Sequence, residues 1–202
     1  MSQLVALSDG PSARKVLVMT DIHIRSEGQK IIQLDPLEKF EMALCHALAL
    51  HKDADCLILT GDLAHSGKVI EYQRLNNALQ LARNAGVAVH LMIGNHDNRE
   101  NFLQVFRDTP VTSSGHIQQV VDIGSTHRFI LLDTLDGPPF SHDKNWGILC
   151  PERITWLTEQ LDHAERDEKA VIVLLHHPPF ELGTPGMDLI RLQNGNELMD
   201  IL

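Results

Sequence analysis

Four short apolar segments of the chain each run directly into polar residues of the types that bind metal ions. In chain order, these residues are Asp21 and His23, Asp62, Asn95 with His96 and Asp97, and His176 with His177. Carboxylate oxygens, an amide oxygen and imidazole nitrogens, without a thiolate, suit Mn, Fe, Co or Zn rather than copper or an iron–sulfur cluster. The four clusters together therefore predict a cation site whose ligands come from distant parts of the sequence.

A carboxylate among these ligands allows a particular kind of chemistry. Its two oxygens can bridge two cations about 3.5–4 Å apart, which is the spacing used in hydrolytic phosphoryl transfer. Two such cations lower the pKa of a shared water, which supplies hydroxide near neutral pH, and they neutralise phosphate oxygens as charge shifts. A second imidazole beside the site would protonate the leaving alkoxide. The residue types thus favour a two-metal hydrolase of phosphate esters.

The elements that must position these residues alternate between short apolar strands and longer segments of helical period. We expect strands at 16–19, 56–59, 87–93, 118–123, 128–133 and 170–175, and helices at 36–51, 69–85, 99–107, 151–165 and 194–202. Near-continuous apolar strands that alternate with helices indicate an α/β domain whose sheet is covered on both faces. Because ligands bind beyond the carboxyl ends of such strands, we expect all four clusters on the same rim of one sheet.

The 202 residues suffice for one domain with a substantial core. Their net charge disfavours some classes of binding partner. The chain carries 17 Lys and Arg against 27 Asp and Glu, a net charge of −10. Such a chain is poorly suited to sequence-independent binding of nucleic acid or to docking on anionic membranes. The 3 cysteines include no C-x-x-C pair, and residues 1–14 lack the features of a secretory signal. We therefore expect a cytoplasmic protein without a nucleic-acid or membrane partner.

In this order and at this spacing, the four clusters resemble the motifs of the calcineurin-like metallophosphoesterase superfamily. Within it, the chain is similar to the bacterial class III cyclic-nucleotide phosphodiesterases and a related glycerophosphodiesterase. Two further segments carry that likeness: Arg25-Ser26-x-Gly28 after the first cluster and Gly186-Met187-Asp188 after the fourth. The resemblance implies a metallophosphoesterase domain over residues 15–202, with the four-layer αββα sandwich of that fold. Residues 1–14 are expected to be frayed or disordered.

The resemblance also assigns metal ligands, residue by residue. Asp21 and His23 would bind the first metal, and Asp62 would bridge both. Asn95 would bind the second metal through its amide oxygen, joined by His176. The implied cofactors are two divalent or mixed-valence ions of Mn, Fe, Zn or Co.

The catalytic residue implied by the resemblance is His96, which would sit beside the substrate as a proton donor or transition-state stabiliser rather than as a ligand. The implied reaction is hydrolysis of a small phosphodiester, such as a 3′,5′-cyclic nucleotide or a glycerophosphodiester, by a hydroxide that bridges the metals. Relatives in this subgroup commonly form dimers or higher assemblies, which implies that the chain can form homo-oligomers.

Three neighbouring residues have secondary or open roles. Asp97 is expected to brace its loop, and His177 is expected to be a neighbour of the site rather than a ligand. Protein phosphatases of the superfamily continue Gly-Asp-x-x-Asp, whereas here His65 stands at the position of the second Asp. This departure disfavours a phosphoprotein phosphatase. It leaves two roles open for His65, either contact with His96 or the phosphate, or a partly exposed loop histidine.

The sequence also departs from the family pattern by an absence. The family ends its site with Gly-His-x-His, one His for each metal, and no such motif follows His177. We expect a C-terminally truncated form of a longer protein; the alternative is a natural chain whose site is open on one side. Each metal would lose a ligand, so we expect weaker metal binding and lower activity than in a full-length protein.

A rival hypothesis from another class is an inactive truncated form or a non-catalytic interaction domain, for which the retromer subunit with this fold is a precedent. The missing Gly-His-x-His motif favours this reading. The intact His96 disfavours it, because a scaffold has no use for a proton donor. A nuclease is disfavoured by the acidic balance and by the lack of a basic stretch interleaved with aromatic residues.

Overall fold

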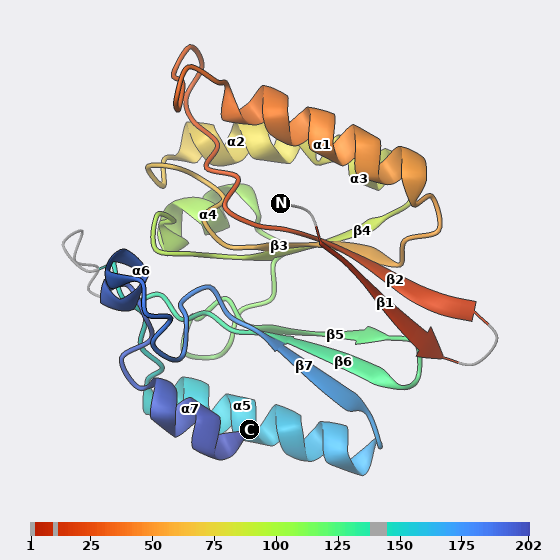
Figure 1. Ribbon diagram of the computed structural model, residues 1–202, viewed down its shortest axis with the longest axis vertical. Helices are drawn as coiled ribbons and strands as arrows, with labels where there is room; N and C mark the ends of the chain where they lie inside the picture. Colours follow the sequence, from red (N-terminus) through yellow and green to blue (C-terminus); the bar gives the residue numbers. More distant parts are fainter. Residues whose placement is uncertain (1–2, 10–11, 138–144) are drawn as a thin grey trace. The chain divides into compact units, whose positions relative to one another are not determined.

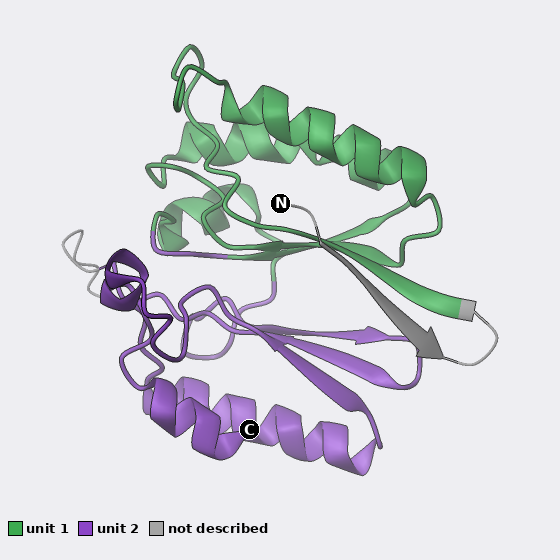
Figure 2. Ribbon diagram, viewed as in Figure 1, with its two compact units in different colours: residues 1–92, 96–109 green, residues 93–95, 110–202 purple. Residues whose placement is uncertain are grey.

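The computed structural model describes residues 3–9, 12–137 and 145–202, shown as a ribbon in Figure 1. The chain divides into two compact units, coloured separately in Figure 2. Unit 1 consists of residues 1–92 and 96–109, and unit 2 consists of residues 93–95 and 110–202. Each unit contains one β-sheet and its own helices.

The sheet of unit 1 places three of the four polar clusters. Its strands are β1 (Gln3–Asp9), β2 (Ser12–Met19), β3 (Cys56–Thr60) and β4 (Ala88–Met92), in the spatial order β1-β2-β3-β4. β2, β3 and β4 run parallel, with Met19 opposite Leu59 and Thr60 opposite Met92. The three strands therefore end along one edge, and the segments that follow them begin side by side.

β1 lies within residues 1–14, where the sequence analysis expects no regular structure. It pairs antiparallel with β2 along its whole length, from Gln3 opposite Val18 to Asp9 opposite Ser12. The strand contains the apolar segment Leu4-Val5-Ala6-Leu7, and its backbone hydrogen bonds to β2 hold it at the edge of the sheet. The expectation of a frayed segment was therefore wrong for residues 3–9, because pairing with a distant strand does not show in the sequence.

The helices of unit 1 are α1 (Pro36–Leu50), α2 (Val69–Ala78), α3 (Gln80–Asn84) and α4 (Arg99–Val105). α1 begins as predicted, since the Asp35 side chain accepts a hydrogen bond from the backbone N–H of Leu37 at 2.9 Å. The single helix expected over 69–85 is interrupted at Leu79 and forms α2 and α3. In Figure 1, α1, α2 and α3 lie along one face of the sheet.

The fourth polar cluster belongs to a different sheet, which corrects the expectation of one rim on one sheet. Unit 2 contains β5 (Gln119–Ile123), β6 (His127–Leu131) and β7 (Ala170–Leu174), in the order β5-β6-β7. β5 and β6 are antiparallel, and β6 and β7 are parallel. The apolar pattern of a strand indicates that it is buried but not which strand it pairs with, so the sequence could not separate the two sheets.

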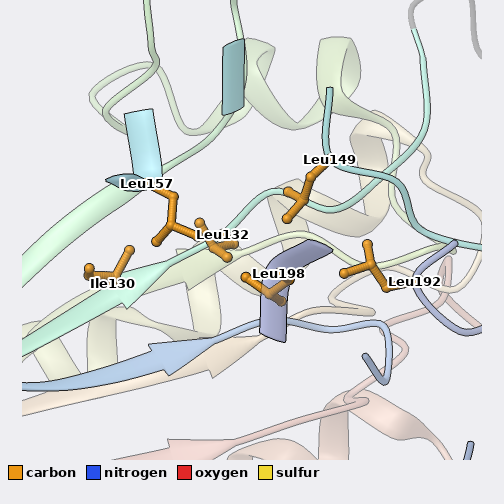
Figure 3. Packing of buried hydrophobic residues seen from close by; sticks show 6 residues of the cluster. All are labelled: Ile130, Leu132, Leu149, Leu157, Leu192 and Leu198. Atoms are coloured by element: carbon orange, nitrogen blue, oxygen red, sulfur yellow. The ribbon is translucent and has the colours of Figure 1, made fainter. Parts of the chain in front are cut away.

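The core of unit 2 joins this sheet to its helices α5 (Pro151–Arg166) and α7 (Gly195–Ile201); the short helix α6 (Pro185–Leu189) precedes α7. The buried cluster in Figure 3 comprises Ile130, Leu132, Leu149, Leu157, Leu192 and Leu198. Leu157 comes from α5 and Leu198 from α7, and both have no exposed surface. The first residue of α7, Gly195, has no room for a side chain, because a Cβ there would lie 1.8 Å from the carbonyl oxygen of Pro179.

Among the residues that the structure describes, none of the helices is both long and apolar enough to cross a membrane.

Replacing Leu157 with Ala should destabilise unit 2 by about 2–5 kcal/mol, because the deletion leaves a cavity in a fully buried cluster. The measurement is urea unfolding followed by tryptophan fluorescence. Glu159→Ala, on the exposed face of the same helix, is the matched control and should change the free energy of unfolding by less than about 0.5 kcal/mol. Equal effects of the two substitutions would contradict this packing.

Candidate metal centre

Three side chains that follow β2 and β3 meet at the carboxyl edge of the unit 1 sheet. One ligand atom from each of Asp21, His23 and Asp62 lies within 4.8 Å of the others. His23 Nε2 is 3.4 Å from Asp62 Oδ2, and Asp62 is only 4% exposed. Two carboxylates so close together repel each other unless a cation lies near them. This set of oxygen and nitrogen donors fits a divalent ion of the Mn, Fe, Co or Zn type.

The backbone of the same three residues is strained. Asp21, His23 and Asp62 have positive φ angles of 53°, 44° and 49°. The left-handed region costs a non-glycine residue on the order of 1–3 kcal/mol where the surroundings impose it. Two backbone hydrogen bonds between the loops hold these residues in the left-handed conformation. They run from Asp21 N to Gly61 O at 3.3 Å and from His23 N to Asp62 O at 2.9 Å. Positive φ also occurs at Ile32, Gln33 and Glu168, but only Asp21, His23 and Asp62 bring their potential ligand atoms together, which points to a functional site.

The loop that follows β4 also contacts the Asp62 side chain. Its Oδ1 accepts a hydrogen bond from the backbone N–H of His96 at 3.0 Å, while Oδ2 faces His23. The two carboxylate oxygens thus have different neighbours and point in different directions. A carboxylate fixed in this way is suited to be a ligand shared between two ions.

His96 lies beside this group with one of its ring nitrogens fixed. Nδ1 is 2.8 Å from the carbonyl oxygen of His65. A carbonyl oxygen can only accept, so Nδ1 carries the hydrogen and Nε2 is the nitrogen that remains for chemistry. The His96 and His23 ring centroids are 4.7 Å apart, and those of His96 and His65 are 5.2 Å apart. Of the two roles left open for His65, the structure shows contact with His96.

The environment of His65 disfavours its charged form. Burial lowers the pKa of His65, and the nearby Arg25, His96 and His23 lower it further. The imidazole is therefore biased toward neutrality, the form in which a histidine nitrogen can bind a metal ion.

Asp97 braces the site, as the sequence analysis expects. Its carboxylate accepts hydrogen bonds from Leu63 N at 3.1 Å, Ala64 N at 3.0 Å and the Tyr72 hydroxyl at 2.9 Å. The Tyr72 hydroxyl in turn accepts from Asn98 N at 2.8 Å. Burial, followed by the charge of Asp97, raises the pKa of Tyr72 well above its usual range, so the hydroxyl keeps its proton.

The sequence gives no signal that the Tyr72 hydroxyl takes part in the site. Its spacing on α2 predicts a buried face, which is correct, but helical periodicity carries no information about the partner of a hydroxyl. The structure shows that Tyr72 ties the loop after Asp62 to the loop after His96 through Asp97.

Unit 2 brings together the remaining predicted ligands. Asn95 Oδ1 and His176 Nε2 lie 3.0 Å apart, although α4, β5, β6, α5 and β7 separate them in the sequence. Both side chains are half-buried. An amide oxygen and an imidazole nitrogen at this separation can bind one cation together.

His177 supports this pair from the interior of unit 2. Its Nδ1 is 2.7 Å from the hydroxyl of Thr134, and the residue is fully buried. Burial, followed by the charge of His176, lowers the pKa of His177 to about 3, so the ring is neutral at physiological pH. Gly147 packs against it, since a Cβ there would lie 2.6 Å from His177 Cγ. His177 is therefore a structural neighbour of His176, as the sequence analysis expects.

The family model for calcineurin-like phosphoesterases matches residues 14–201 of this chain. The chain belongs to the calcineurin-like phosphoesterase family. The metallophosphoesterase fold that the sequence motifs imply is thereby confirmed.

Curated relatives of this calcineurin-like phosphoesterase carry phosphodiesterase names. It is 35% identical to a probable cyclic nucleotide phosphodiesterase of Rhodopseudomonas palustris, over 93% of this chain and 66% of the relative. It is 30% identical to a probable glycerophosphodiester phosphodiesterase of Arcobacter nitrofigilis, again over 93% of this chain and 66% of the relative. The chain thus spans about two thirds of the length of these relatives.

A solved structure shares the fold of this calcineurin-like phosphoesterase. A dimetal phosphatase from Danio rerio superposes with a TM-score of 0.65 at 13% identity, covering 92% of this chain and 76% of that one. At this identity the likeness supports the fold alone.

Replacing Tyr72 with Phe should lower the free energy of unfolding by about 1–3 kcal/mol, because the buried Asp97 carboxylate then loses a donor and the Asn98 N–H loses its acceptor. Thermal and urea unfolding measure this change. Gln73→Ala, at the exposed neighbouring position of α2, is the control and should be nearly neutral. A neutral Tyr72→Phe would contradict the bracing role.

Proposed function

We propose that this calcineurin-like phosphoesterase is a metal-dependent hydrolase of small phosphodiesters. The observation that carries the proposal is the convergence of Asp21, His23 and Asp62, with His96 beside them. The names of the relatives support a phosphodiester, either a cyclic nucleotide or a glycerophosphodiester, as the substrate.

The proposed ligands form two sets. In unit 1, Asp21, His23 and Asp62 would hold one cation, with Asp62 suited to be a bridging ligand; in unit 2, Asn95 and His176 would bind a cation together. Within each set the potential ligand atoms lie close together. The absence of thiolates from both sets favours ions of Mn, Fe, Zn or Co. When bound, the two ions would supply hydroxide near neutral pH and neutralise the phosphoryl oxygens.

The proposed role of His96 follows from its fixed ring. Because Nδ1 donates to the carbonyl oxygen of His65, the second proton of the imidazolium sits on Nε2. Transfer of that proton to the leaving alkoxide returns His96 to its neutral form and yields an alcohol. The backbone N–H of the same residue holds Asp62, so one loop residue would position both the shared ligand and the proton donor.

A small substrate is also supported by the surface beside Asp21. A pocket of about 270 Å³ is lined by Met19, Thr20, Asp21, Ile22, Pro36, Lys39, Phe40 and Ala43. Its size is close to the lower end of small-molecule sites. Lys39 offers a cation for an anionic substrate, while Phe40 and Ala43 offer apolar contacts for its organic part. The cytoplasmic location and homo-oligomers expected from the sequence stay predictions.

Asp62→Ala should abolish hydrolysis of bis(p-nitrophenyl) phosphate in the presence of Mn²⁺. The loss should exceed the ~10–100-fold that removal of an outer-shell partner of a metal site typically costs, because a shared ligand is removed. Asp162→Ala, an exposed carboxylate on α5, is the matched control and should keep the wild-type rate. Unchanged turnover by Asp62→Ala would refute the proposed function.

Removing metal ions from the wild-type protein with a chelator should abolish the same hydrolysis, and adding back Mn²⁺ should restore it. The assay is repeated with Fe²⁺, Zn²⁺ and Co²⁺ because the ligand types suit all four ions. Metal binding in every case without any turnover would favour the rival reading, a non-catalytic interaction domain.

A further inference from the structure

His65 brings a third imidazole ring to His23 and His96 in unit 1, and the proposed reaction does not require it. His23, His65 and His96 each offer a nitrogen, and these nitrogens lie within 4.8 Å of one another. The ring centroids are 4.7 Å apart for His23 and His96, 5.2 Å for His65 and His96, and 5.4 Å for His23 and His65. Small rotations of these side chains would bring the nitrogens to the spacing of ligands around a single ion.

His65 has a buried nitrogen that calls for an explanation. Its Nδ1 is shielded from solvent and has no hydrogen-bond partner among the residues that the structure describes. A buried polar atom without a partner costs about 1–3 kcal/mol and is uncommon in folded proteins. His65 offers one ring nitrogen to the group with His23 and His96, so a cation bound among the three imidazoles would give this ring a partner.

His96 already has the geometry of a metal-binding histidine. Such residues usually donate one ring N–H to a carbonyl or carboxylate oxygen, which leaves the other nitrogen with its lone pair. His96 Nδ1 lies 2.8 Å from the carbonyl oxygen of His65, and the neutral ring therefore presents the lone pair of Nε2. The backbone of one cluster member thus orients the ring of another.

We propose that His23, His65 and His96 form a second cation site, selective for borderline ions such as Zn²⁺, Ni²⁺ and Cu²⁺. A set of three nitrogens suits these ions better than Mn²⁺ or Mg²⁺, which prefer oxygen. His23 also belongs to the group with Asp21 and Asp62, so ions at the two places compete for its ring. The site differs from the carboxylate group in having only nitrogen ligands, and it should therefore bind Mn²⁺ less well than that group does.

Occupation of this site has a consequence that rests on the proposed function. An ion on His96 Nε2 takes the lone pair that must hold the proton for the leaving alkoxide. Excess Zn²⁺ would therefore inhibit a Mn²⁺-loaded enzyme by removing its proton donor, without changing the phosphodiester or its binding.

The test uses Cu²⁺ as a spectroscopic probe and Ni²⁺ as a calorimetric one, on the whole chain. We expect the electron paramagnetic resonance spectrum of the Cu²⁺-loaded protein to show coupling to three imidazole nitrogens, and His65→Asn to reduce this to two. His65→Asn should also weaken Ni²⁺ binding at least tenfold. The substitution keeps the backbone carbonyl that holds His96, so the loop retains its anchor.

Two variants provide matched controls. His46→Asn removes an exposed histidine of α1 and should leave the Cu²⁺ spectrum and the Ni²⁺ affinity unchanged. Asp21→Asn alters only the carboxylate group and should weaken Mn²⁺ binding more than Ni²⁺ binding. Circular dichroism checks that each variant is folded, and His96→Asn replaces His65→Asn should the latter fail to fold.

The proposal is overturned by Cu²⁺ coupling that is the same in His65→Asn and wild type, or by Ni²⁺ binding that depends on Asp21 but not on His65. Neither measurement depends on hydrolysis of a substrate. The three-histidine site can therefore be supported even when the proposed hydrolase activity is refuted. As a kinetic readout, the concentration of Zn²⁺ that halves Mn²⁺-dependent hydrolysis should rise at least tenfold in His65→Asn, relative to that variant's own uninhibited rate.

Discussion

The arrangement of unit 1 depends on holding the buried carboxylate of Asp62 at the end of a buried strand. Burial of a charge is costly unless hydrogen bonds or an opposite charge compensate it. Here the compensation comes from the backbone N–H of His96 and from the His23 ring, while Asp21 adds a second carboxylate nearby. The positive φ angles of Asp21, His23 and Asp62 are tolerated because these contacts fix the loops. A cation would offset the repulsion between the carboxylates, so the geometry is best explained as that of a metal site.

Both units stabilise their polar residues with partners buried beneath them. In unit 1, Asp97 and Tyr72 connect the loops that carry Asp62 and His96. In unit 2, His177 is locked neutral between Thr134 and Gly147, directly next to His176 in the sequence. Rigid support of this kind keeps ligands in place before an ion binds, which lowers the cost of ordering them.

The three-histidine group, which we propose as a second cation site, lies within the same unit as the carboxylate group. Its rings lie next to the carboxylates of Asp21 and Asp62 and share His23 with them. Oxygen-rich ligands favour harder ions, whereas imidazoles favour borderline ions. His65 supplies the third nitrogen of the group.

The α/β class, most helix and strand positions, the family and a set of candidate metal ligands could be predicted from the sequence, because apolar periodicity and ligand types are local properties. The pairing of β7 with β6 in a second sheet, the formation of β1 and the separation of α2 from α3 became clear from the three-dimensional structure alone. It also decided that Tyr72 supports Asp97 and that His65 meets His96. These contacts between strands, hydroxyl groups and rings join residues that are far apart in the chain. Local sequence patterns do not predict which distant residues the fold brings together.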